Sequence, residues 1–169
     1  MAKHFSKKGL SVHVTWFRWR ALFLHAIYLI SKVKGLHRSV KLLNGRSVRI
    51  HVFEADKALA TLYPYVLFLD LIIFYLLQRI GDSFKDVVIY DRSFLDALVD
   101  VYYMRYRSGL GLGRTLLKLY LSFTFAVTRN IMVLDASENI ILMRKRDIVS
   151  LKEIMFKRRL YRILSRVLR

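Results

Sequence analysis

The feature that most restricts the fold of this chain is a long apolar run from Leu62 to Ile80, LYPYVLFLDLIIFYLLQRI. Its length is near the ~20 residues that a helix needs to cross a bilayer. Pro64 and Asp70 interrupt the run, and a carboxylate at mid-span costs roughly 3 kcal/mol on membrane-insertion scales. A helix buried on most of its faces inside an α/β domain explains the same run, and we favour it over a transmembrane helix. Asp70 then faces inward and requires a partner.

Strand-like and helix-like segments alternate along the chain. Asn44-Gly45 lies between two β-branched runs, which is typical of a β-hairpin. Val87–Tyr90 is a short unbroken apolar run, as in a strand buried on both faces of a parallel sheet. The predicted elements are a strand at Ser11–Trp16, a helix at Phe17–Lys34 ended by Gly35, the hairpin, a helix at about Ala55–Ile80, a strand at Val87–Tyr90, helices at Phe94–Tyr106 and Arg114–Thr128, a strand at Asn130–Ser137, and about two final helices broken near Asp147–Ser150. This alternation predicts an α/β fold with a mainly parallel sheet, whose ligands bind at the carboxyl ends of the strands.

The chain is strongly basic. Among its 169 residues, 30 are Lys or Arg and 12 are Asp or Glu, which gives a formal charge of +18. We therefore expect an anionic partner: phosphate, nucleic acid or an acidic membrane surface. Cysteine is absent, which excludes disulfide scaffolds, thiol catalysis and Cys-based zinc sites. The five histidines have no metal-ligand spacing, and no Ser/His/Asp set can be nominated.

The sharpest local motif is Asp91-Arg92-Ser93, directly after the Val87–Tyr90 run. At the carboxyl end of a strand in a sheet, the guanidinium of Arg92 can donate two parallel hydrogen bonds to a phosphate. Asp91 is a hard oxygen ligand that can bind magnesium or its waters. A structural alternative is an ion pair that caps the next helix. Asp96 and Asp100 follow at spacings that crowd the same end of the sheet. They serve equally well as solvated or Arg-paired helix carboxylates.

Two further segments carry candidate binding residues. Trp16 and Trp19 can stack on a base, and Arg18 or Arg20 can meet a phosphate. Core tryptophans and solvated arginines are as reasonable. Arg144 and Arg146 lie in a basic cluster after the strand that ends in Asp135. In a phosphoryl-transfer enzyme such a cluster closes over the substrate. Elsewhere it is usually a solvated face.

Taken in order, these segments resemble the thymidylate kinases, a family of P-loop nucleoside monophosphate kinases. VVIYDRSFLDALVD resembles the family's Asp-Arg motif and following helix, and LYPYVLFLDLIIFYLL resembles the long helix before it. KKGLSVHVTWFR is similar to the family's second strand and its arginine. IMVLDASENIILMRKRD is similar to the strand ending in Asp and the Arg-bearing lid, and KEIMFKRRLYRIL to the helix after the lid. The resemblance extends over about 150 residues of the chain.

The resemblance implies a role for each matched residue. Arg92 would bind the acceptor phosphate, with Arg18 and Trp16 assisting at the acceptor, and Asp91 would organise Mg²⁺ through water. Arg144 and Arg146 would be lid cations, and Asp96 and Asp100 would lie at the substrate. The implied ligands are ATP, Mg²⁺ and a nucleoside monophosphate, with dTMP expected as the acceptor. A homodimer and a cytoplasmic location are also expected, and no nucleic-acid or membrane partner is assigned.

The chain departs from the family pattern at several places. Ser93 stands where thymidylate kinases usually carry an aromatic residue or His, and the downstream Tyr-Gln that helps to read the base is absent, with Asp100 near that place. No G-x-x-x-x-G-K-S/T loop, which cradles the phosphates of ATP, occurs in the chain. We therefore expect residues 1–169 to be a single, partial thymidylate kinase-like domain. Its expected fold is a three-layer P-loop kinase-like parallel sheet without the central loop-bearing strand and with a β-hairpin insertion.

Two functions thus remain open at the level of sequence. The first is a thymidylate kinase-like phosphotransferase that is inactive or impaired as this chain stands, because the ATP cradle is missing. The alternative is a non-enzymatic basic protein that binds nucleic acid or an acidic membrane surface. Steep salt-dependent binding to DNA that survives Arg92→Ala would favour the alternative.

Overall fold

The computed structural model describes residues 2–16, 22–42, 45, 47–111, 113–127, 131, 133, 135–137, 140, 141 and 150–167. The elements in chain order are α1 (Ala2–Ser6), β1 (Val12–Trp16), α2 (Leu24–Val33), β2 (His37–Lys41), β3 (Ser47–His51), the 3-10 helix η1 (Phe53–Ala55), α3 (Lys57–Asp82), β4 (Val87–Asp91), α4 (Phe94–Arg107), α5 (Arg114–Val127) and α7 (Leu151–Val167). The fold is therefore mixed α/β, and most of the described elements are helices.

Two small sheets account for the described strands. β1 and β4 pair in parallel, with Val12 opposite Val87 and Trp16 opposite Asp91. β2 and β3 pair antiparallel, with Lys41 opposite Ser47. This pairing confirms the hairpin predicted from Asn44-Gly45, and Gly45 has the positive φ of 80° that such a turn requires.

The strand expected at Asn130–Ser137 is not formed where the structure describes this segment, which is at residues 131, 133 and 135–137. Ile131 and Val133 instead pack, half-buried, against the hydrophobic core. In the described part of the chain the parallel sheet therefore consists of β1 and β4 alone. The β4 residues from Val87 to Tyr90 are half-buried rather than fully enclosed, because no further described strand pairs beside them.

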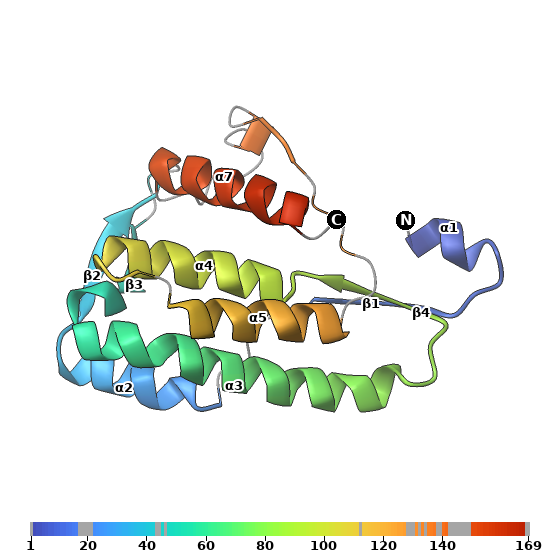
Figure 1. The fold of residues 1–169 in the computed structure, drawn as a ribbon, viewed down its shortest axis with the longest axis horizontal. Helices are drawn as coiled ribbons and strands as arrows, with labels where there is room; N and C mark the ends of the chain where they lie inside the picture. Colours follow the sequence, from blue (N-terminus) through green and yellow to red (C-terminus); the bar gives the residue numbers. More distant parts are fainter. Residues whose placement is uncertain are drawn as a thin grey trace.

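The helices lie roughly side by side, and β1 and β4 extend from one end of the stack (Figure 1). α4 occupies the middle, where it contacts α3, α5 and α7, and α2 packs on α3. α4 contributes the largest share of the buried apolar residues, including Phe94, Leu98 and Val101. Leu67 and Leu71 of α3 and Tyr120 of α5 complete the same core.

Asp70 has the partner that its inward position requires. Its side chain is 2% exposed and accepts hydrogen bonds from the backbone N–H groups of Leu22, Phe23 and Leu24 over 3.0–3.1 Å. Those donors have no acceptor within the first turn of a helix. α2 thus begins at Leu24, where Asp70 caps it. The predicted helix included Leu22 and Phe23, which lie outside α2, and its predicted start at Phe17 falls outside the described residues.

α3 is only partly enclosed, in contrast to the predicted burial on most faces. Among the described helices it alone is long and apolar enough to cross a membrane, a test that core helices also pass. Its most apolar 18-residue window has a mean hydropathy of 1.9 and is 39% buried. One face of α3 therefore belongs to the core, and another face is open.

Pro64 lies inside α3 and cannot donate the backbone hydrogen bond that would satisfy the carbonyl of Ala60. The Nη1 atom of Arg105, on α4, donates to that carbonyl over 3.5 Å. The phenol of Tyr120, on α5, donates to the carbonyl of Pro64 itself over 2.8 Å. Two neighbouring helices thus attach to α3 at its proline.

Candidate functional site

The parallel register of β1 and β4 brings two predicted site segments together. Trp16 and Asp91 are opposite each other at the carboxyl ends of their strands, and Arg92 follows directly. Asp91 and Arg92 are both exposed. The edge at which ligands bind in parallel sheets therefore carries an accessible carboxylate beside an accessible guanidinium.

Arg92 has a backbone conformation that is unfavourable for a residue with a side chain. Its φ is +73°, and no other described residue except glycine has a positive φ. This left-handed conformation costs roughly 1–2 kcal/mol for an L-residue. Strain of this kind clusters at binding and catalytic sites, where the surrounding structure maintains it. The conformation is therefore an independent indication that the position of Arg92 is functional.

Ser93 and Asp96 build the start of α4 by a capping box. The carboxylate of Asp96 accepts from the backbone N–H of Ser93 over 2.6 Å, and the Ser93 hydroxyl accepts from the N–H of Leu95. Asp96 also accepts a 2.5 Å hydrogen bond from the phenol of Tyr161 on α7. Burial, followed by the charge of Asp96, raises the pKa of Tyr161. These contacts give Asp96 a structural role, and its predicted role at the substrate stays a prediction.

Asp100 is held in the same interface. Its carboxylate lies 2.5 Å from the ammonium of Lys157, which also pairs with Glu153 over 2.6 Å. Burial alone would lower the pKa of Lys157, but the two carboxylates outweigh burial and raise it. Asp100 thus fixes α7 to α4, and binding of substrate by this residue is likewise still a prediction.

The described acids share one property, with a single exception. Each is engaged inside the molecule by a hydrogen bond or an ion pair: Glu54, Asp56, Asp70, Asp82, Asp86, Asp96, Asp100, Asp135 and Glu153. The exception is Asp91, for which the described residues supply no such partner. Among the described acids, the carboxylate next to the strained arginine is therefore the one left available to a ligand.

Five predicted binding residues lie outside the described residues: Arg18, Trp19, Arg20, Arg144 and Arg146. The backbone of Trp16 is placed by strand pairing. A search of the described His, Asp and Glu side chains finds no group of three that could hold a metal ion. Within the described part of the chain Asp91 would thus be a lone ligand, which suits Mg²⁺, because this ion usually keeps several waters and binds phosphate oxygens.

A polar cluster beneath β1 escaped the sequence analysis. The Nδ1 atom of His13 lies 2.5 Å from Asp82, whose other carboxylate oxygen accepts from the phenol of Tyr90 over 2.8 Å. Thr15 accepts a 3.2 Å hydrogen bond from Gln78. His13 and Thr15 project to one side of β1 because side chains alternate along a strand. That alternation was the only available signal, and it did not identify α3 as the partner.

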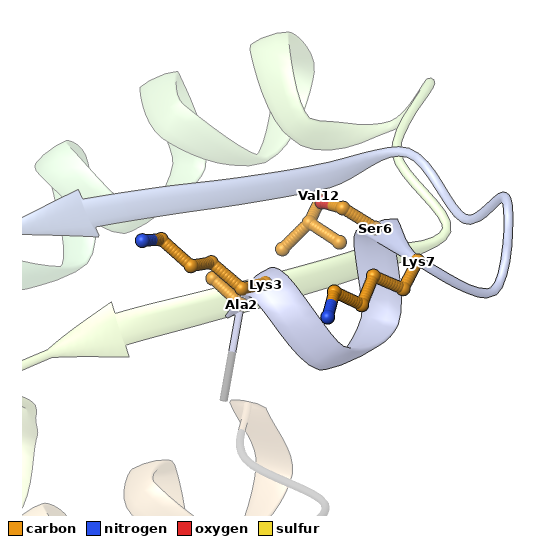
Figure 2. A pocket seen from close by; sticks show the side chains of 5 residues that line it. All are labelled: Ala2, Lys3, Ser6, Lys7 and Val12. Atoms are coloured by element: carbon orange, nitrogen blue, oxygen red, sulfur yellow. The ribbon is translucent and has the colours of Figure 1, made fainter.

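A pocket lies at the opposite end of β1 from Asp91. Figure 2 shows its lining, which comes from one turn of α1 and the start of β1: Ala2, Lys3, Ser6, Lys7 and Val12. None of these residues was predicted to bind a ligand. The pocket is thus separate from the candidate site at the carboxyl edge.

Comparison of the chain with protein-family models, with curated proteins and with solved structures finds no match.

Proposed function

We propose that this chain is a thymidylate kinase-like phosphotransferase domain that binds the phosphate of a nucleoside monophosphate, dTMP in the first instance, at Asp91-Arg92. The observation that carries the proposal is that Asp91, which is exposed and has no partner among the described residues, directly precedes Arg92, which has a φ of +73°. The order of motifs along the chain supports the choice of family. The parallel register of β1 and β4 supports the choice of edge.

The chemistry of the two side chains suits a phosphomonoester. The planar guanidinium of Arg92 can donate two parallel hydrogen bonds to one phosphate, which a lysine cannot reproduce. Asp91 would hold Mg²⁺ through its waters, and the ion would supply positive charge near the phosphate. Asp96 and Asp100 would contribute indirectly, because their contacts with α7 fix the first turns of α4 directly behind Arg92.

The donor side of the reaction has no counterpart in these 169 residues. No G-x-x-x-x-G-K-S/T sequence is present to surround the phosphates of ATP. We therefore propose acceptor binding with little or no phosphoryl transfer by this chain. A continuous assay with ATP, Mg²⁺ and dTMP tests the second half of the statement, and robust turnover would overturn it.

Acceptor binding is tested directly by isothermal titration of the full chain with dTMP, with thymidine as the ligand that lacks the phosphate. We expect binding of dTMP to exceed that of thymidine and to weaken by at least about tenfold in Arg92→Ala, which corresponds to one charge-assisted bidentate contact. Arg114→Ala is the matched control, since Arg114 is also exposed and begins α5 far along the chain from β4. Equal affinities of Arg92→Ala and the parent chain would contradict the assignment.

A further inference from the structure

α3 carries a continuous apolar stripe on its open face. Leu62, Tyr65, Leu69, Leu76 and Ile80 are between 45% and 71% exposed, and their spacing places them along one side of the helix. We call these five residues the α3 stripe. Between Lys57 and Arg79 the only charged residue of α3 is Asp70, which is buried against α2. The stripe is thus uninterrupted by charge over most of the helix.

The ends of the stripe are cationic. Lys57 begins α3 and Arg79 lies in its last turns, and both are exposed. At the Lys57 end, α2 adds Lys34, which pairs with Asp56 over 2.5 Å, and the neighbouring Val33, which is 87% exposed. The acids of α3, Asp70 and Asp82, are buried, and α2 has none. The surface therefore combines an apolar centre with an exposed cation at each end, Lys57 and Arg79, which together form its rim. The carboxylate beside Lys57, Asp56, is paired with Lys34.

We propose that the α3 stripe docks this protein on an anionic membrane surface, with α3 lying in the plane of the interface. An interfacial helix inserts an apolar face among the lipid chains while Lys and Arg meet the headgroup phosphates. The Lys57 and Arg79 ends and the total charge of +18 complement such a surface. This docking is independent of the nucleotide site proposed above.

Two other arrangements fit the same observations less well. A helix that crosses the bilayer would have to withdraw Asp70 from the three backbone N–H groups that it caps. A second copy of the chain would pack the stripe against itself about a two-fold axis, which brings the cationic ends of identical faces together. An anionic lipid surface covers the apolar residues and neutralises the rim at once.

The test is flotation of the full chain with vesicles of phosphatidylcholine alone and of phosphatidylcholine mixed with phosphatidylglycerol. We expect binding to the mixed vesicles that is weakened by about tenfold or more in Leu69→Glu/Leu76→Glu, because both side chains would then carry charge into the interface. Ile163→Glu is the matched control, since Ile163 is 49% exposed on α7, across the molecule from α3 (Figure 1). Circular dichroism verifies that each variant is folded.

A second variant separates the rim from the stripe. Lys57→Glu/Arg79→Glu keeps every apolar residue and should lose the preference for phosphatidylglycerol. Equal binding of both double variants and the parent chain, equal binding to the two kinds of vesicle, or an equal loss in Ile163→Glu would each overturn the proposal. The proposal would also be overturned if the chain bound no vesicles and instead formed a dimer in sedimentation velocity that Leu69→Glu/Leu76→Glu dissociates. Arg92→Ala should bind vesicles like the parent chain, so failure here and failure of nucleotide binding are distinguishable.

Discussion

The phenol of Tyr161 donates a 2.5 Å hydrogen bond to Asp96, which joins the last described helix to the first turn of α4. Because Asp96 also caps α4, this contact holds the helix that begins directly after Asp91-Arg92. We expect Tyr161→Phe to lower the free energy of unfolding by about 1.5–3 kcal/mol, as for other hydrogen bonds to a charged group. Urea unfolding measures this. A double-mutant cycle with Asp96→Ala that shows no coupling would contradict the structural role.

Asp70 should be the carboxylate whose loss is most damaging. Asp70→Leu removes the acceptor of three backbone N–H groups at the start of α2. The contact with Leu24 is buried, and the contacts with Leu22 and Phe23 are partly buried. An unpaired buried donor costs about 1–3 kcal/mol, so we expect thermal or urea unfolding to show a loss of at least about 1 kcal/mol. Leu69→Ala is the control. Leu69 is next to Asp70 in the chain, but its side chain is 46% exposed, so truncating it should lower the free energy of unfolding far less. A neutral or stabilising Asp70→Leu would instead favour a membrane-spanning α3.

Replacement of Arg92 by glycine should separate stability from binding. Arg92→Gly removes the strain of a φ of +73°, and after the entropic penalty of glycine we expect a gain of up to about 1 kcal/mol in the free energy of unfolding. Arg92→Ala keeps the strain and should show no such gain. Both variants should lose affinity for dTMP to the same extent. A destabilised Arg92→Gly would mean that the guanidinium stabilises the fold.

Acid sensitivity should depend on Asp135. Arg158 and Arg162 donate to its carboxylate and hold its pKa well below the ordinary value. A carboxyl whose folded pKa is lowered stabilises the protein above its unfolded pKa of about 3.9, and this contribution disappears as the pH falls toward the folded pKa. Asp135→Asn should therefore be less stable at neutral pH and lose less stability below about pH 4. Asp91→Asn is the control, because Asp91 has no partner among the described residues.

The predictions from sequence succeeded where the determinants are local. The hairpin follows from Asn44-Gly45, whose glycine has the positive φ that the turn needs. The expected bounds of α4 and α5 agree with the structure to within one residue at each end. The parallel strand before Asp91 was identified by its unbroken apolar run.

The predictions failed where a distant residue decides the outcome. α2 begins at Leu24 because Asp70, 46 residues further along the chain, accepts its N–H groups. The partners of Asp96 and Asp100 on α7, Tyr161 and Lys157, are also distant in the sequence and were not predicted. For the candidate site, the sequence predicted that Asp91 and Arg92 follow a strand of the parallel sheet, and β4 ends at Asp91; their role in binding stays a prediction. The strain at Arg92 and the absence of a partner for Asp91 in the described chain required coordinates.

The proline of α3 has a consequence for how the helices recognise one another. In the interior of a regular helix every backbone carbonyl already accepts a hydrogen bond, so backbone hydrogen bonding does not favour one turn over another for a neighbouring helix. The carbonyl of Ala60 differs, because Pro64 has no N–H to donate to it. It can therefore accept the hydrogen bond from Arg105 at this one turn of α3. Pro64→Ala would restore the backbone hydrogen bond within α3. It would also occupy the carbonyl that now accepts from Arg105, so the contact that aligns α4 with this turn of α3 would be lost.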